Sequence, residues 1–147
     1  MERVNLMRLE SMVNNYAKIL NDLEEEYILY SDMKKEDKYF KQVSNSFRGN
    51  INDLYIIIED YIAFSLNLAG ICLLEISLKE HIENAYKLKL IPKYIYDFYN
   101  KTLDNRKILL YQDKNLGIEN LVKLYKSNKR ILNNFEEFLD NRLKNCI

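Results

Sequence analysis

The sequence predicts an all-α protein, a single domain of residues 1–147 folded as an antiparallel bundle of four to five helices. Glycine occurs only three times and proline once, whereas all-β folds need turn residues every ~8–12 positions. Hydrophobic residues instead recur every three or four positions over long stretches, which is the period of a helix with one apolar side. A composition of 48% hydrophobic and 30% charged residues is sufficient for a buried core and a solvated surface.

The first helix is expected from about Val4 to Tyr30. Its apolar stripe is Leu9, Val13, Tyr16, Leu20, Leu23, Tyr27 and Tyr30. A polar stretch over 31–37 separates it from the next helix.

The second helix is expected to start near Asp37 and to end near Gly70. Its inward seam is Phe40, Val43, Phe47, Ile51, Leu54, Ile58, Tyr61, Ser65, Leu68 and Cys72. Around 54–68 the apolar residues cover most of the circumference, which indicates a central helix or an interface. Gly49 is expected to mark a weak point or the close approach of another backbone. The apolar surface exceeds what one small bundle needs, so a homodimer is expected.

The remaining chain predicts shorter helices and then a long one. Ser77 and Glu80 fit a capping box that starts a short helix ending near Leu88. Pro92 suits the first turn of a fourth helix, with Ile95, Phe98, Tyr99, Thr102, Leu103, Arg106, Leu109 and Leu110 along it. After a turn at 113–117, a last helix runs from Ile118 to about Leu143, with Leu121, Leu124, Tyr125, Ile131, Leu132, Phe135, Phe138 and Leu139 inward.

Charge and hydropathy argue for a soluble, cytoplasmic protein without a membrane span. The 22 basic and 22 acidic residues cancel, which argues against strong electrostatic binding of nucleic acid. The longest apolar stretch, 54–76, contains Glu59 and Asp60, and such carboxylates are costly near the middle of a bilayer. Cys72 and Cys146 are expected to be free thiols.

No motif in the sequence indicates a cofactor or a metal. Three glycines do not build a phosphate-binding loop, and the only histidine, His81, has no cysteine near it in the sequence. Glu59 and Asp60 on the second helix leave two interpretations open. They pair with Lys or Arg at a helix–helix contact, or one of them lines a functional cleft.

The segment with the most distinctive pattern begins at the end of the fourth helix. Residues 105–113 read NRKILLYQD, and they are followed by IENLV at 118–122 and NFEEFL at 134–139. This arrangement resembles the HEPN superfamily, and within it the HepT-like proteins encoded beside minimal nucleotidyltransferases. In that family a helix carries an Arg, four variable residues and a His. The order of long and short helices agrees over nearly the whole chain.

The resemblance implies a HEPN-like dimer that belongs to a toxin–antitoxin system and binds a nucleotidyltransferase partner. In active members, Arg and His from two subunits face each other across a cleft and cut RNA without a metal. The matching catalytic positions here are Arg106 and Tyr111. The residues expected to line the cleft are Glu59, Asp60, Asn105 and Asp113.

The departures from the family pattern bear on catalysis. Tyr111 stands where the family has His, and Lys107 stands where it often has Asn. A phenol with a pKa of ~10 is a poor base near neutral pH, unlike an imidazole at ~6.5, and general acid–base help is worth roughly 10²–10⁴-fold. Ribonuclease activity is therefore expected to be weak or absent. Asp113 also replaces the tyrosine that the nucleotidyltransferase adenylylates, which leaves Tyr111 as the nearest substitute.

Two alternatives stay open. In one, the chain is an active ribonuclease toxin in which Arg106 binds phosphate, Tyr111 donates a proton and Glu59 or Asp60 assists. In the other, it is a non-catalytic helical scaffold or ligand-binding bundle. That second alternative predicts that Arg106 lies in an ion pair with Asp104, Asp113 or a carboxylate of the second helix, inside one subunit.

Overall fold

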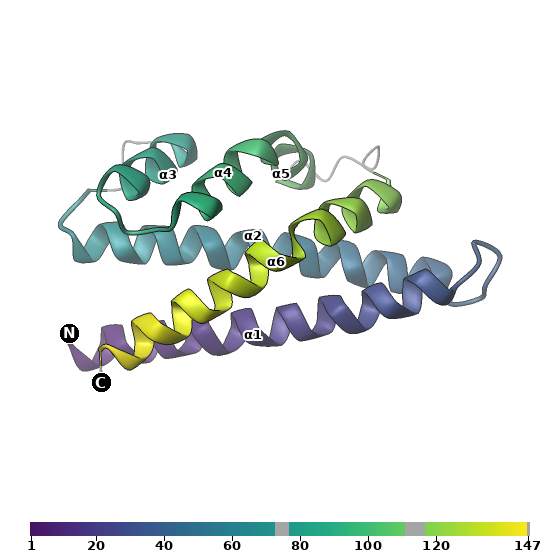
Figure 1. Cartoon of the computed structure of the whole chain (residues 1–147), viewed down its shortest axis with the longest axis horizontal. Coiled ribbons are helices and arrows are strands. Elements are labelled where there is room, and N and C mark those ends of the chain that lie inside the picture. Colours follow the sequence, from purple (N-terminus) through teal and green to yellow (C-terminus); the bar gives the residue numbers. More distant parts are fainter. Residues whose placement is uncertain (73–76, 111–116, 147) are drawn as a thin grey trace.

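The structure is a computed structural model that describes residues 1–72, 77–110 and 117–146, apart from the side chains of residues 108 and 110. Within these residues the chain is all-helical, as predicted, and forms six helices (Figure 1). Their bounds are α1 Arg3–Asp32, α2 Phe40–Leu68, α3 Leu78–Lys87, α4 Lys93–Lys101, α5 Leu103–Leu110 and α6 Ile118–Lys144.

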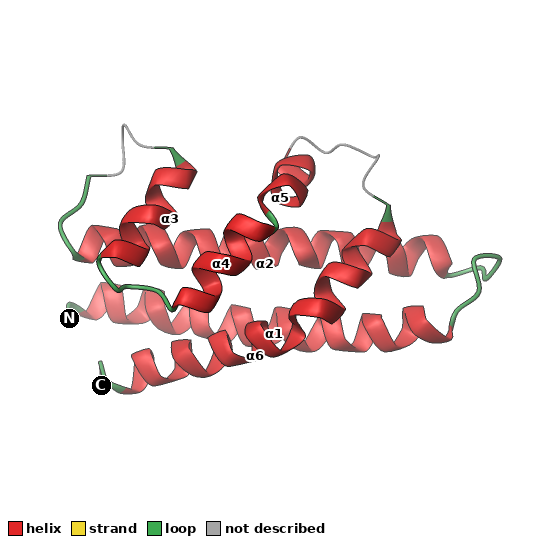
Figure 2. Cartoon of the chain, turned by 45° about the horizontal axis from the view of Figure 1, so that its top comes forward, coloured by secondary structure: helices red, strands yellow, loops and turns green. Residues whose placement is uncertain are grey.

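The second long helix, α2, is the centre of the bundle. It packs against α1, α3, α5 and α6. Helices α3, α4 and α5 lie on one side of α2, and α1 lies on the other (Figures 1 and 2). Helix α6 runs antiparallel to α1, and an ion pair of 3.0 Å between Lys35 and Glu119 joins the α1–α2 turn to the start of α6. The central position of α2 explains why apolar residues surround it.

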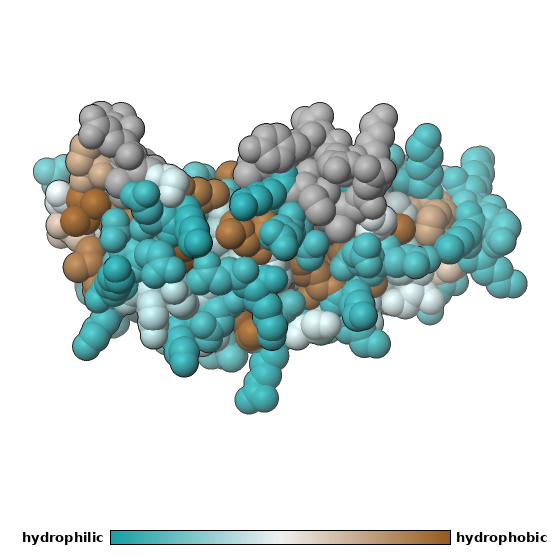
Figure 3. Space-filling model, turned by 90° about the horizontal axis from the view of Figure 1, so that it is seen from above, coloured by the Kyte–Doolittle hydropathy of each residue, from teal (hydrophilic) through white to brown (hydrophobic). Residues whose placement is uncertain are grey.

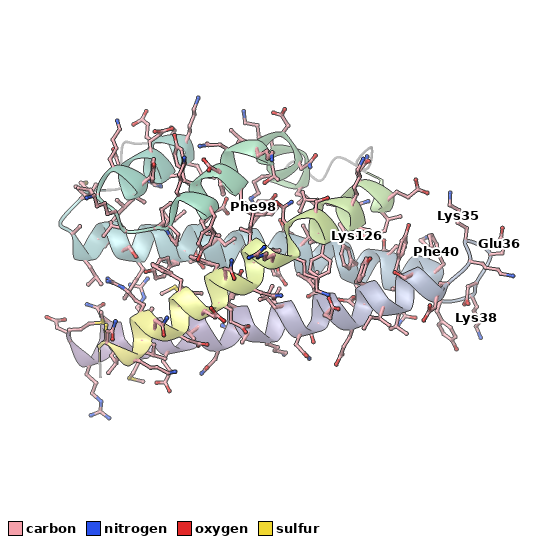
Figure 4. All side chains as sticks on the ribbon, in the orientation of Figure 1. Lys35, Glu36, Lys38, Phe40, Phe98 and Lys126 are labelled. Atoms are coloured by element: carbon pink, nitrogen blue, oxygen red, sulfur yellow. The ribbon has the colours of Figure 1, made fainter. Side chains whose placement is uncertain are left out.

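The core contains most of the residues of the apolar stripes that the sequence predicts for α1, α2 and α6. Tyr16, Ile58 and Phe135 are fully buried. The Tyr16 hydroxyl donates to the backbone carbonyl of Leu132 at 2.7 Å, so the polar end of this buried ring is satisfied. Phe98 likewise lies in the interior beside α2, whereas charged residues of the α1–α2 turn such as Lys38 point away from the bundle (Figure 4).

The end of α2 forms a Schellman motif. Gly70 has φ +82°, its N–H donates to Asn67, and the N–H of Ile71 donates to Leu66. This pattern needs a residue in the left-handed region, where glycine has no steric cost. The predicted end of the helix near Gly70 is confirmed. The inward positions predicted for Leu68 and Cys72 are wrong, because both lie at or beyond this end and are exposed.

The predictions for the helix cap at Ser77 and for Gly49 have different outcomes. The Ser77 hydroxyl accepts a hydrogen bond from the N–H of Glu80, so the predicted N-terminal cap of α3 is present. Gly49 lies inside α2 without any heavy atom within 4 Å of the place its Cβ would occupy. The close approach of another backbone at Gly49 is therefore wrong, and the helix continues through it.

The predicted fourth helix is two helices, which makes six where four to five were expected. The break is at Thr102, whose backbone has φ −106° and ψ 13°. Its side-chain hydroxyl donates to the carbonyl of Phe98 at 2.8 Å and accepts from the Tyr55 hydroxyl at 2.6 Å. A threonine that bonds back to its own helix often bends it, and here the bend turns α5 toward α2.

The surface above α3, α4 and α5 is mostly hydrophilic, with smaller hydrophobic areas between (Figure 3). None of the helices in the described ranges is both long and apolar enough to span a bilayer.

Candidate functional site

Arg106 lies on α5 with its side chain directed into the bundle, where α5 packs on α2. Its exposed fraction is 2%, which makes it the largest fully buried side chain in the described part of the chain. A buried arginine is rare unless its charge is paired. The surroundings of this guanidinium therefore decide what Arg106 does.

The Arg106 guanidinium is paired with Glu59 on α2 through two parallel hydrogen bonds. Nη2 donates to Oε1 at 2.6 Å and Nε donates to Oε2 at 3.0 Å, which is the bidentate geometry of a strong arginine–carboxylate pair. Nη1 donates to Oδ1 of Asn52 at 2.8 Å. The Glu59 carboxylate also accepts from the Tyr99 hydroxyl at 2.5 Å. The pair thus joins α2, α4 and α5.

A second layer of side chains supports this pair. The guanidinium carbon of Arg106 lies 5.3 Å from the centre of the Tyr55 ring, within cation–π range. Tyr55 is itself fully buried and bonds to Thr102 at the α4–α5 break. The break and the ion pair are therefore parts of one arrangement, because Thr102 positions the start of the helix that carries Arg106.

The electrostatics of the cluster favour a charged pair and neutral phenols. Burial lowers the pKa of Arg106, but the hydrogen bonds and charge of Glu59 outweigh it and raise the pKa above its ordinary value. Burial raises the pKa of Tyr55 to about 12. Burial and the bond to Glu59 raise the pKa of Tyr99 well above its usual range. Near neutral pH, neither the Arg106 guanidinium nor the phenols of Tyr55 and Tyr99 have a pKa suited to exchanging protons.

The other predicted site residues are not all brought together. Glu59 meets Arg106, but Asp60 is exposed, and burial followed by the Glu59 charge raises its pKa. Asn105 is half-buried next to Arg106. Tyr111 and Asp113 lie outside the described residues. Of the two interpretations of the second-helix carboxylates, pairing at a helix–helix contact is the one the structure shows for Glu59.

The sequence reasoning missed Asn52 and Tyr55 as members of this cluster. With Glu59 they form a stripe of residues at steps of three and four on α2, so they share one side of the helix. Polar residues on an otherwise apolar helix side are the signal that was available. The sequence does not indicate that Arg106 is their partner, because Arg106 lies on another helix, 47 residues beyond Glu59 in the chain.

A second polar cluster lies in a groove between α1 and α6 with a volume of ≈ 440 Å³. The Glu24 carboxylate accepts from the Tyr125 hydroxyl and from the Lys129 ammonium, each at 2.5 Å. These two hydrogen bonds lower the pKa of Glu24. The groove is open to solvent, and its polar groups already bind one another across the two helices.

The described residues contain no group of three or more His, Cys or acidic side chains arranged to hold a metal ion. Cys72 and Cys146 are free, as predicted. His81 is half-buried, and its Nε2 atom is buried without a hydrogen-bond partner in the structure. It lies on α3, outside the Arg106 cluster.

A dimer was expected because α2 has more apolar surface than one small bundle needs, but the structure does not leave such a surface exposed on α2. Of the large hydrophobic side chains on this helix, only Ile56 and Leu68 are exposed. The apolar circumference that suggested an interface is covered by the other helices of the same chain.

Comparison of the chain with protein-family models, with curated proteins and with solved structures gives no match in any of the three.

Proposed function

We propose that the chain is a non-catalytic helical interaction module, in which the arginine of the HEPN-like motif holds the fold together. The observation that carries this proposal is the bidentate pair between Arg106 and Glu59, with Arg106 only 2% exposed. Three N–H groups of the guanidinium already donate inside the chain. A phosphate would have to displace Glu59 and enter the core to reach them.

The chemistry of the cluster opposes RNA cleavage at Arg106. A phosphate that approaches the guanidinium also approaches the Glu59 carboxylate, and two anions repel each other in a site of low dielectric. The neighbouring phenols stay protonated near neutral pH, so they do not act as bases. In the sequence, Tyr111 stands where active members of the family that the chain resembles have a histidine.

The experiment compares purified protein with a variant that removes the pair but keeps the core packed. Arg106→Ala alone leaves Glu59 without its partner and weakens the fold, so loss of cleavage would be ambiguous. The double variant Arg106→Met with Glu59→Met avoids this, because an apolar pair fills the same space. We expect no cleavage of total RNA by the wild-type chain above a mock preparation. Cleavage by the wild type that the folded double variant lacks would overturn the proposal.

The narrower form of the proposal is a HepT-like protein whose partner is a minimal nucleotidyltransferase in a toxin–antitoxin system. It is supported by the motif residues around Arg106 and by the two long helices that come first and the long helix that comes last. It predicts a nucleotidyltransferase in the neighbouring open reading frame that co-purifies with this chain. A neighbour of another class, or a nucleotidyltransferase that does not bind, would contradict it.

A further inference from the structure

The groove between α1 and α6 has two ends with different side chains. At one end, the Glu24 carboxylate of α1 accepts hydrogen bonds from Tyr125 and Lys129 of α6. These bonds fix which residues of the two antiparallel helices face each other (Figure 2). About one helical turn further along the groove lie two amide side chains, Asn21 of α1 and Asn133 of α6.

The other end of the groove is lined by Ala17 of α1 and Glu136 of α6. Ala17 comes seven residues before Glu24, and Glu136 comes seven residues after Lys129. Because seven residues are about two helical turns, each side chain returns to the same side of its helix, and the two residues face each other across the groove. The methyl group of Ala17 is small, so it leaves space beside the Glu136 carboxylate.

Glu136 is a half-buried carboxylate that has no ion pair and no hydrogen bond among the described residues. Burial raises its pKa, and the charges of Asp140 and Glu137 raise it further. All three effects disfavour the charged form of this carboxylate. A cation placed beside Glu136 would therefore stabilise it, and Lys129 does not fill this role because its ammonium is bound to Glu24.

The lining residues define the charge and the size of a matching ligand. Glu24 and Glu136 each carry a negative charge and Lys129 carries a positive one, so one negative charge of the groove is not balanced. A single positive charge on the ligand would balance it. The groove volume of ≈ 440 Å³ lies near the lower end of the range of roughly 300–1,000 Å³ that is typical of small-molecule sites.

The two amides in the middle of the groove are suited to hydroxyl groups. Asn21 donates through Nδ2 to Glu25 at 3.3 Å, which leaves its Oδ1 able to accept a hydrogen bond. The Asn133 amide has no hydrogen-bond partner in the part of the chain that the structure describes, so both its donors and its acceptor are available. A hydroxyl group donates and accepts, so it can bind either amide.

We propose that this groove binds a small primary ammonium compound that carries hydroxyl groups, such as an amino sugar. The ammonium lies beside Glu136 in the space over Ala17, where its three N–H donors form charge-assisted hydrogen bonds. The hydroxyl groups bind Asn21 and Asn133. The Glu24 end has its own cation in Lys129, so it does not favour a second ammonium on the ligand.

Other classes of ligand match the groove less well. A phosphate or a nucleic acid would be repelled by Glu136 and by the charges of its acidic neighbours. A divalent metal ion needs several oxygen ligands, and no group of three or more acidic, His or Cys side chains is arranged for one within the described ranges. The proposal is independent of the interaction role proposed above, because the described residues that line the groove do not include any of the Arg106 cluster.

The test is a titration of the purified full chain with glucosamine, at a pH at which its amine is protonated. NMR spectra report the backbone amides, and those of residues 17–24 and 129–136 are expected to shift saturably, with a dissociation constant in the millimolar range or below. Glucose lacks the amine, and in N-acetylglucosamine the amine is blocked. Both are expected to bind at least about tenfold more weakly, because neither carries a cation for Glu136.

Three variants locate the site. Glu136→Gln removes the charge and keeps the shape, and it is expected to weaken glucosamine binding by about tenfold. Glu137→Gln is the matched control, because it removes the same charge from the next residue, which is exposed and does not line the groove. It is expected to weaken binding by less than about twofold, since solvent and salt screen an exposed charge. Ala17→Leu fills the space opposite Glu136 and is expected to abolish binding with every charge intact.

Circular dichroism verifies that each variant is folded, and Ala17→Val replaces Ala17→Leu if the larger side chain unfolds the chain. Three results would each overturn the proposal. They are glucosamine without saturable shifts in the groove, glucose that binds as well as glucosamine, and equal losses of binding in Glu136→Gln and Glu137→Gln.

Discussion

Tyr99 and Arg106 donate hydrogen bonds to the same oxygen, Oε2 of Glu59, at 2.5 Å and 3.0 Å. Tyr99 lies on α4 and Arg106 on α5, so one carboxylate of α2 fixes both helices on either side of the break at Thr102. The break allows both donors to converge on Glu59. The cluster is thus a structural junction of three helices.

The first prediction concerns Tyr99→Phe, which removes one donor from the Glu59 carboxylate. Hydrogen bonds to charged groups contribute about 1.5–3 kcal/mol, so a loss of this size in the free energy of unfolding is expected in urea denaturation. Tyr94→Phe is the control, since Tyr94 lies on the same helix and its hydroxyl has no hydrogen-bond partner among the described residues. Equal effects of the two substitutions would show that the Tyr99 bond contributes nothing specific.

A second prediction concerns alkaline pH. Burial raises the pKa of Tyr55 from 10.0 to about 12, so the folded state keeps this proton where the unfolded state loses it. Stability from this group is complete below pH 10 and falls as the pH rises toward 12, by up to about 3 kcal/mol. The free energy of unfolding, measured across this range, should fall less steeply with rising pH for Tyr55→Phe than for the wild type. Identical slopes would mean that Tyr55 ionises normally in the folded chain.

The third prediction concerns the end of α3. Lys89 has φ 57° and occupies the same position in a Schellman motif that Gly70 occupies after α2. A side chain in this region is strained, so Lys89→Gly should raise the free energy of unfolding by about 0.5–1 kcal/mol. Lys87→Gly, two residues earlier at the last position of α3, should lower it by a few tenths of a kcal/mol, since this residue is helical but lies at the end of the helix. Thermal denaturation of both variants tests these opposite changes in stability. A loss of stability in Lys89→Gly would show that the backbone at Lys89 is not strained.

Much of the fold follows from hydrophobic period alone. The ranges predicted for α1 and α6 agree with the structure to within two residues at each end, because their apolar stripes are regular and polar segments bound them. The break at Thr102 was missed because the pattern stays in phase from Phe98 to Arg106. It depends on a hydrogen bond from Tyr55, which is 47 residues away in the sequence.

The candidate site was predicted only in part. The motif predicted Arg106 as a site residue, and the adjacent carboxylates predicted Glu59 as a residue of a helix contact or cleft. Their contact with each other depends on how α5 packs on α2. Periodicity places a residue on one side of a helix without choosing its partner from another helix. An ion pair with a carboxylate of the second helix was among the arrangements left open, and it is the one that the structure shows.

The measurement that tests the central claim most directly is a double-mutant cycle of Arg106→Met and Glu59→Met in urea denaturation. If the pair holds the fold, each single variant loses about 3–5 kcal/mol, because it leaves an uncompensated buried group. The double variant then loses much less than the sum, with a coupling of about 2–3 kcal/mol. Single variants that each lose less than about 0.5 kcal/mol, with no coupling, would contradict the account, since Arg106 would then be free of Glu59 in solution.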